Sequence, residues 1–205
     1  NKQDCEFGYR DSVFKHKLKG KGMIIAVYLR LSKIHKLATD YYSMWAKYES
    51  IEKELSQNGS PPYSIADVYN AVVNIRTRQL PDWNVVPTAG SFFKNPIISK
   101  QKLIELQNKI PELQYYPADQ LSYAQSNDQT FERDEFVKVP AGRLLDHLGW
   151  KGKQIDNCMT YATHAMVVTH NGKANGKELI EYVKLMQDDV LSKFGIDLEM
   201  EVVVV

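Results

Sequence analysis

Apolar residues recur at helical spacing in two long stretches of the chain. The clearer pattern predicts a helix over residues 176–194, with Gly195 as its C-terminal stop. Its buried stripe consists of Leu179, Val183, Met186, Val190 and Phe194. The second pattern predicts a helix that begins after Ser64, with Asp67 completing a capping box, and ends before Pro81. Its apolar face consists of Ile65, Val68, Val72 and Ile75. Shorter helices are expected at 99–110 and from 141 or 142 onward.

Other stretches have the pattern of β-strands. Residues 8–14 and 23–31 flank a basic link that contains glycine, which predicts a hairpin. Residues 86–96 are too rich in small and aromatic residues for an amphipathic helix and are expected to form a strand and a loop. Residues 196–205 alternate, which predicts a final strand with its acidic residues on one face. Because helices and strands are mixed without a βαβ repeat, the predicted class is α+β, with mixed or antiparallel sheets, flanking helices and two lobes.

Composition and charge narrow the function classes. Of the 205 residues, 43% are hydrophobic and 25% charged, and the net charge is +1, which is typical of a globular protein and argues against disorder. A near-neutral chain is also a poor candidate for broad attraction to nucleic acid or anionic membranes. The longest apolar run, residues 23–29, is far shorter than the roughly 20 residues of a membrane span. Two distant cysteines indicate reduced thiols in a cytoplasmic protein, and the first residue, Asn1, suggests a cut within a longer chain or a processed end.

Two segments could carry chemistry. The carboxylates of Asp197, Glu199 and Glu201 repel one another if crowded, so this face is either solvated or meets a cation or a substrate. Candidate cations are Arg10, Arg30, Arg76, Arg78 and Lys94. Residues 89–96 combine glycine, a small hydroxyl, a cation and an amide. This combination is typical either of a binding loop or of a polar turn beside aromatic core residues. The histidine pair His164 and His170 lacks a third metal ligand, and no GxSxG elbow supports a hydrolase triad.

Five motifs, in order along the chain, resemble one enzyme family. They are EFGYRDSVFK (6–15), IRTRQLPD (75–82), GSFFKNP (90–96, preceded by TAG), PAGRLLDHLGWKG (140–152) and LEMEV (198–202). Together they resemble the UDP-N-acetylenolpyruvoylglucosamine reductases (UDP-N-acetylmuramate dehydrogenases), cytoplasmic flavoenzymes of bacterial peptidoglycan synthesis. The resemblance covers the family's C-terminal part, and the N-terminal half that supplies most of the FAD-binding fold has no counterpart here.

The resemblance implies a reaction and the residues that perform it. NADPH reduces FAD, the flavin delivers hydride to C3 of the enolpyruvyl ether of UDP-N-acetylglucosamine, and a protein acid protonates C2. Ser91 matches the proton donor, Arg10 the active-site arginine, whose donor fork suits a carboxylate, and Glu201 the catalytic glutamate.

The resemblance also implies binding residues and two domains. The matched substrate-binding positions are Tyr41, Lys94, Asn95, Tyr116 and Gln79; those near the cofactor are Arg76 and Arg10; no metal site is implied. The expected division is a flavin-side domain of residues 1–79 and 195–205 and a substrate-binding domain of residues 80–194. The isolated chain is then expected to bind little FAD and to lack turnover.

The sequence departs from the family pattern at several positions. Gln79 stands where the family commonly has a lysine, Trp83 replaces a proline, and Tyr161 and His164 stand where histidine and glutamine are usual. The lost lysine charge favours an alternative, a UDP-sugar-binding module without catalysis, whereas the retained catalytic trio favours the enzyme. A third alternative is nucleic-acid binding through the basic link 15–21. The sequence does not specify the oligomeric state.

Overall fold

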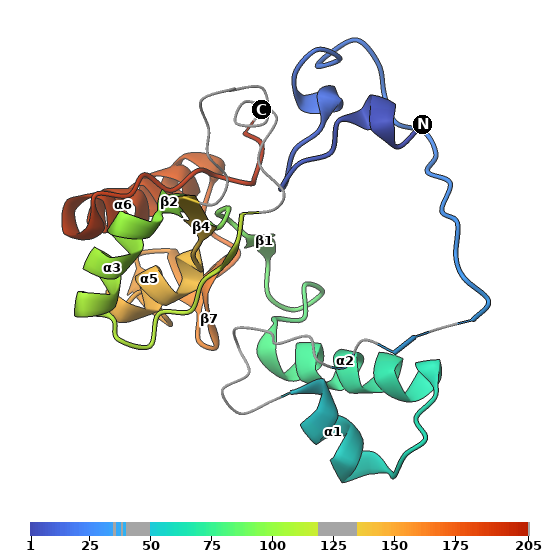
Figure 1. Cartoon of the computed structure of the whole chain (residues 1–205). Helices are drawn as coiled ribbons and strands as arrows, with labels where there is room; N and C mark the ends of the chain where they lie inside the picture. The colour runs from blue at the N-terminus through green and yellow to red at the C-terminus, as the bar shows by residue number, and fades with distance from the viewer. Residues whose placement is uncertain (35, 38, 40–49, 119–134, 205) are drawn as a thin grey trace. The chain divides into compact units, whose positions relative to one another are not determined.

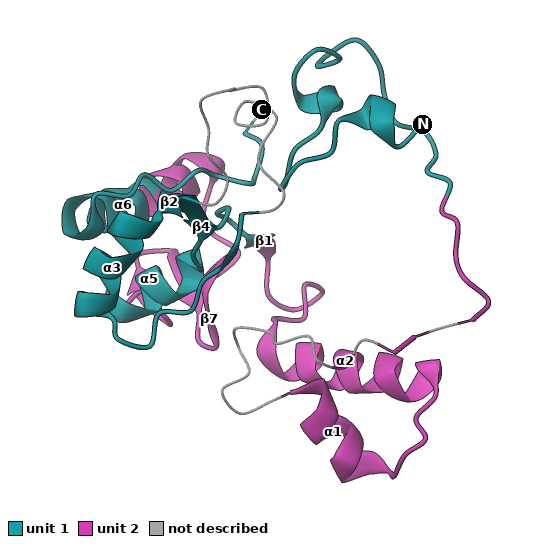
Figure 2. Cartoon of the chain, in the orientation of Figure 1, with its two compact units in different colours: residues 1–28, 91–148, 184–205 teal, residues 29–90, 149–183 magenta. Residues whose placement is uncertain are grey.

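The computed structural model describes residues 1–34, 36–37, 39, 50–118 and 135–204 (Figure 1). The chain divides into two compact units (Figure 2). Unit 1 comprises Asn1–Tyr28, Ser91–Leu148 and Lys184–Val205, and unit 2 comprises Leu29–Gly90 and Gly149–Val183. The units do not test the expected flavin-side and substrate-binding domains, which stay a prediction.

Unit 1 contains a three-stranded antiparallel sheet of order β2-β4-β3. Its strands are β2 (Ile97–Ser99), β3 (Tyr116–Pro117) and β4 (Phe136–Lys138). Helix α3 (Lys100–Lys109) packs against β2 and β4, and α5 (Ala141–His147) follows β4 along the chain. The 3-10 turns η1 (Gln3–Cys5) and η2 (Val13–Lys15) lie in the first segment of this unit.

Unit 2 contains a four-stranded sheet of order β1-β7-β6-β5 and a pair of helices. The strands are β1 (Thr88–Ser91), β5 (Gln154–Ile155), β6 (Cys158–Tyr161) and β7 (His164–His170). The last residue of β1, Ser91, already belongs to unit 1. Strand β7 is buried along nearly its whole length. Helix α6 (Gly176–Phe194) begins in unit 2 and ends in unit 1.

The paired helices of unit 2 are α1 (Ile51–Asn58) and α2 (Ile65–Gln79). They enclose a small apolar core that includes Leu55 and Ile75. Glu54, only 6% exposed, faces Arg78 across this pair at 2.6 Å and also accepts hydrogen bonds from Asn58 and Asn74. The guanidinium of Arg78 holds the pKa of Glu54 below its ordinary value.

The α+β class and the helices predicted from periodicity are confirmed. Helix α6 has the predicted bounds, and four of its five stripe residues are buried. The Ser64–Asp67 capping box is present at the start of α2, although Ile65 on the predicted apolar face is 52% exposed. The predicted strand and loop at 86–96 contain β1, and α3 and α5 lie where short helices were expected.

Two predicted β-elements are wrong. Residues 23–31 form no strand, and most of their apolar side chains are exposed; Tyr28 is 96% exposed. The hairpin is absent because residues 8–14 fold into a tight turn and η2, so they offer no strand edge. Residues 196–204 form no regular strand and make a single β-bridge, at Met200.

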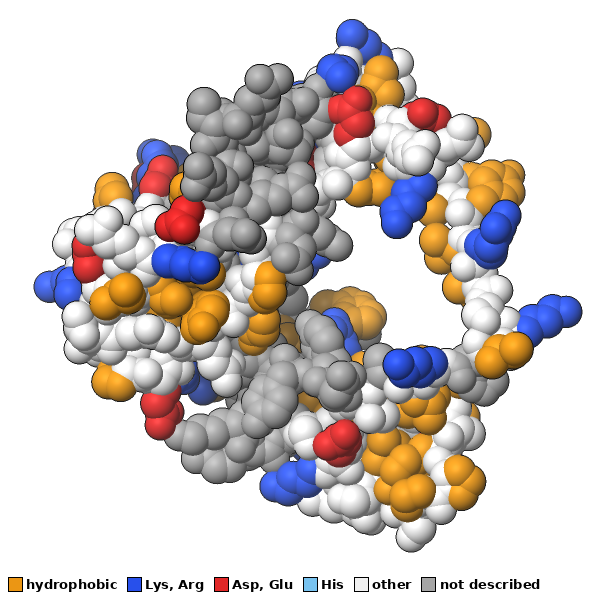
Figure 3. Space-filling model, in the orientation of Figure 1, with side chains coloured by type: hydrophobic (Ala, Val, Ile, Leu, Met, Phe, Trp, Pro, Cys, Tyr) orange, Lys and Arg blue, Asp and Glu red, His pale blue; other side chains and the backbone are white. Residues whose placement is uncertain are grey.

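The surface carries dispersed charges and some exposed apolar side chains. On the face in Figure 3, lysine and arginine side chains are scattered, and apolar side chains gather over α1 and α2. Exposed apolar residues of α2 are Ile65, Tyr69 and Val73. Among the residues described, no helix combines the length and hydrophobicity that a membrane span requires.

Candidate functional site

The first segment of unit 1 presents Arg10 from a tight turn. Gly8 and Asp11 exchange backbone hydrogen bonds of 3.0 and 3.3 Å across it. Arg10 itself has a left-handed backbone, with φ at 54°, which is uncommon for a residue other than glycine. The ammonium group of Lys15 donates to the Arg10 carbonyl at 2.6 Å. These bonds hold the backbone of the candidate arginine in one place.

The last segment of the chain crosses the residues that follow Ser91. The backbone N–H of Lys94 donates to the Glu199 carbonyl at 2.9 Å, and the N–H of Glu201 donates to the Phe92 carbonyl at 2.8 Å. Phe93 and Met200 face each other in the bridge between these bonds. This pairing brings Glu201 next to a residue that adjoins Ser91 in sequence.

Each of two acids on the terminal segment meets a cation. The Nε of Arg10 lies 2.9 Å from Oε1 and 3.0 Å from Oε2 of Glu201, although 191 positions separate the two residues. Glu199 forms an ion pair with Lys94. Of the alternatives left open for this acidic face, the structure shows contact with cations, and Arg10 and Lys94 are the two of the five candidate cations that meet it.

The Arg10 guanidinium keeps donor capacity in this arrangement. Its side chain is 55% exposed, and Nε alone is engaged by Glu201. Within the described part of the chain, its two terminal Nη groups have no hydrogen-bond partner. A guanidinium donates through five N–H groups, so Arg10 can bind an anionic group while Glu201 holds Nε.

Tyr9 connects the arginine turn to the loop after Ser91, a role that the sequence analysis did not identify. Its hydroxyl accepts the backbone N–H of Asn95 at 3.1 Å. The ammonium group of Lys138 lies 4.3 Å from the centre of its ring, and the Arg10 guanidinium 5.9 Å from it. Both distances are within the range of cation–π attraction. The position of Tyr9 directly before Arg10 in a matched motif was the available signal; no motif pointed to Lys138.

The remaining predicted residues of unit 1 lie on β1, on β3 and in the loop between β1 and β2. Ser91 is the last residue of β1 and is partly buried. Tyr116 on β3 is the register partner of Lys138. The side chain of Asn95 caps α5, because its Oδ1 accepts the Ala141 N–H at 3.0 Å. The structure therefore shows a capping role for the carbonyl end of the Asn95 amide, beside its predicted role in substrate binding.

The other predicted residues belong elsewhere. Arg76 and Gln79 lie on α2 in unit 2; Arg76 is exposed, and the Gln79 carbonyl accepts a hydrogen bond of 2.6 Å from the Thr163 hydroxyl. Tyr41 lies outside the described residues. His164, at the start of β7, is 2% exposed, and its Nδ1 accepts the Met166 N–H at 3.2 Å. Burial, with a smaller contribution from the nearby charge of Lys151, lowers the pKa of His164 to about 3.

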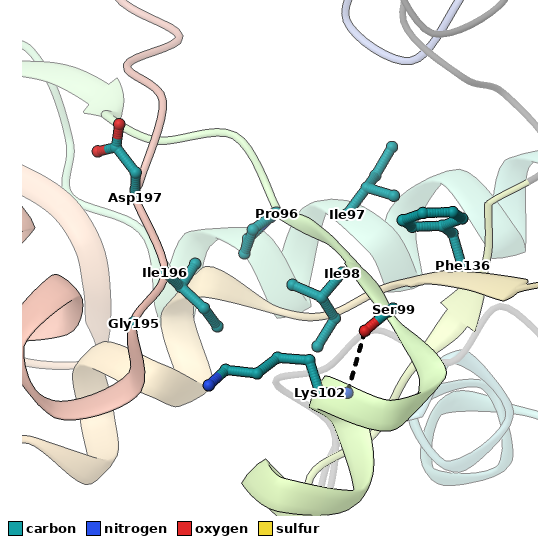
Figure 4. A pocket seen from close by; sticks show the side chains of 9 residues that line it. All are labelled: Pro96, Ile97, Ile98, Ser99, Lys102, Phe136, Gly195, Ile196 and Asp197. Carbon is teal, nitrogen blue, oxygen red and sulfur yellow. Dashed lines mark hydrogen bonds between the residues drawn. The ribbon is translucent and has the colours of Figure 1, made fainter. Parts of the chain in front are cut away.

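A pocket of about 470 Å³ lies beside the crossing segments in unit 1 (Figure 4). Its walls come from β2, α3, Phe136 and residues 195–197. Ile196 points toward Ile98, whereas the Asp197 carboxylate points away from it (Figure 4). Arg10, Ser91 and Glu201 do not line this pocket.

Comparison with known proteins adds the family context. The family model described as "UDP-N-acetylenolpyruvoylglucosamine reductase, C-terminal domain" matches residues 81–205. A UDP-N-acetylenolpyruvoylglucosamine reductase of Flavobacterium johnsoniae is 35% identical over 203 residues, covering 98% of this chain and 54% of that protein. Proteins of the same name from Pseudoalteromonas atlantica and Chromobacterium violaceum are each 36% identical, with 50% and 52% of their lengths covered. The chain thus spans about half the length of these curated relatives.

Proposed function

Since this chain belongs to the UDP-N-acetylenolpyruvoylglucosamine reductase family, we propose that it supplies the substrate-binding and protonating part of such a reductase. The substrate would be the enolpyruvyl ether of UDP-N-acetylglucosamine and the product UDP-N-acetylmuramate, a peptidoglycan precursor. The observation that carries the proposal is the Arg10–Glu201 pair, which joins two motifs from opposite ends of the chain beside the Ser91 loop.

In this proposal Arg10 binds the substrate carboxylate. The exposed Nη groups donate to the carboxylate oxygens, while Glu201 fixes the guanidinium through Nε. As negative charge builds on the enolate-like intermediate, the same guanidinium stabilises it. The Ser91 hydroxyl then gives its proton to C2. A weak acid serves here because the carbanion that receives the proton is strongly basic.

The hydride that reaches C3 needs a donor, and FAD reduced by NADPH is the donor that the family implies. The motifs match only the family's C-terminal part, and the 470 Å³ pocket contains neither Arg10 nor Arg76, the two residues matched to positions near the cofactor. We therefore assign FAD binding mainly to the portion of the relatives that this chain does not span, and we expect the isolated chain not to turn over. The proposed domains are residues 1–79 with 195–205 on the flavin side and 80–194 on the substrate side.

The test uses the full-length gene product. We expect a yellow protein that oxidises NADPH when UDP-N-acetylenolpyruvoylglucosamine is added, and whose kcat falls by roughly 10²- to 10⁴-fold in Ser91→Ala, as for loss of a proton donor. The matched control is Ser192→Ala, on the exposed face of α6, which should retain the wild-type rate. A colourless protein that still binds the UDP-sugar would refute the reductase and support the binding module.

A further inference from the structure

Two carboxylates on the terminal segment, those of Glu199 and Glu201, lie close to two cations, Lys94 and Arg10. Glu199 lies opposite Lys94 and Glu201 opposite Phe92 in the short pairing around Met200. Side chains two residues apart on an extended segment share a face and lie about 7 Å apart, within reach of diagonal partners with long side chains. Glu201 is therefore a diagonal neighbour of Lys94 as well as the partner of Arg10.

The alternation of this segment keeps both acids on the polar face. Ile196 and Leu198 are buried, and Figure 4 shows Asp197 pointing to the opposite side from Ile196. The Gln187 amide fixes the segment by donating to the Leu198 carbonyl at 2.6 Å. Burial thus decides which face the acids share, but it does not decide which acid pairs with which cation.

The side chains of the two cations differ in their exposure to solvent, and therefore in the cost of leaving each charge unpaired. The Lys94 side chain is 16% exposed, whereas that of Arg10 is 55% exposed. An unpaired charge costs more where water is excluded, so Lys94 has the greater need of a carboxylate. Without Glu199, the carboxylates left on this face are those of Asp197 and Glu201, and of the two only Glu201 lies within the pairing around Met200.

We propose that Glu199 is a positioning residue: by pairing with Lys94 it leaves the Glu201 carboxylate to Arg10. Glu199 acts through its neighbour and does not touch the substrate. This inference rests on the proposed function for its catalytic consequence, but the change of partner that it describes occurs in the protein alone.

The first measurement detects the change of partner without activity. In the full-length protein, the Nε–H resonance of Arg10 is assigned by its disappearance in Arg10→Lys. We expect this resonance to shift in Glu199→Gln, because Glu201 turns toward Lys94, and to return toward its wild-type position in Glu199→Gln/Lys94→Met, where the competing cation is gone. Asp197→Asn is the control, since Asp197 shares the face but has no partner in the described parts of the chain.

The second measurement separates kcat from KM. We expect Glu199→Gln to lower kcat about tenfold by misplacing a catalytic group. Adding Lys94→Met should restore kcat to within about threefold of wild type while raising KM, because Lys94 is proposed to bind substrate. A structural role for Glu199 would instead leave the double variant as slow as the single one.

The outcomes distinguish the two proposals. An Arg10 resonance that Glu199→Gln leaves unmoved overturns the positioning role, whether or not the protein turns over. If the resonance shifts and returns as expected but the wild type lacks reductase activity, the positioning role stands and the proposed function fails. An active wild type whose kcat is unchanged in Glu199→Gln overturns the positioning role alone.

Discussion

The buried histidine of β7 makes the stability of this protein depend on pH. His164 is 2% exposed, and its pKa is about 3 in the folded protein against 6.5 as the ordinary value. The His164 imidazole is therefore protonated near pH 6.5 in the unfolded chain, but only near pH 3 in the folded chain. Because the unfolded state holds more protons in that window, the free energy of unfolding falls as the pH falls.

The size of the effect follows from the two pKa values. Each pH unit between them changes the free energy of unfolding by about 1.4 kcal/mol. At pH 5 the unfolded imidazole is almost fully charged and the folded one is neutral, so lowering the pH from 7.5 to 5 removes about 2 kcal/mol. His164→Gln removes the titrating group at a position where the family usually has glutamine. The variant should therefore not lose this part of the free energy of unfolding when the pH is lowered.

The assay is urea unfolding of wild type and His164→Gln at several pH values. All other titrating groups are shared, so the difference between the two proteins isolates His164. We expect this difference to change by about 2 kcal/mol in favour of the variant between pH 7.5 and 5. The control is His170→Gln, which makes the same change at the partly buried end of the same strand. A difference that stays constant with pH would refute the reasoning.

Two further predictions concern specific contacts. Arg78→Met leaves the buried Glu54 carboxylate with only its two asparagine donors. Hydrogen exchange in α1 and α2 should then become faster by an amount equivalent to about 2 kcal/mol. Arg76→Met, at an exposed position on the same helix, is the control and should have little effect. Exchange as slow as in wild type would show that the pair does not hold these helices. Tyr9→Phe removes the hydroxyl that accepts the Asn95 N–H but keeps the ring that the two cations face. The free energy of unfolding of unit 1, measured in urea, should fall by about 1 kcal/mol. A loss no larger than that caused by Tyr115→Phe, at an exposed tyrosine, would contradict this prediction.

The helices could be predicted from sequence because their determinants are local. A stripe of apolar residues and a glycine at φ 65° set the whole length of α6. The capping box of α2 depends on two residues three positions apart. Such signals need no information about the rest of the chain.

The predicted hairpin failed because a strand depends on a partner. Residues 23–31 have the composition of a strand, but among the described residues no neighbouring edge pairs with them. The prediction for the terminal segment was only partly wrong. Its alternation correctly separates buried Leu198 from exposed Glu199, but the segment pairs over too few residues to form a regular strand. Alternation therefore predicted which side chains are buried better than it predicted hydrogen bonding.

The candidate site was partly accessible from sequence. Motif resemblance selected Arg10 and Glu201, and the structure brings them together. It could not reveal that Tyr9 joins two motifs through one hydrogen bond, or that Asn95 caps a helix, because these contacts depend on the packing of distant segments. The roles of Ser91, Tyr116 and Gln79 stay predictions.

The separation of 191 positions between Arg10 and Glu201 bears on how the protein acquires its chemistry. Contacts between residues so far apart in sequence close a very long loop, and such contacts contribute little to the early, locally driven steps of folding. A chain whose helices have formed can thus carry every candidate catalytic side chain and still be inert. This ion pair is therefore expected to form after the helices, and activity of the full-length protein is expected to recover more slowly during refolding than helical structure does.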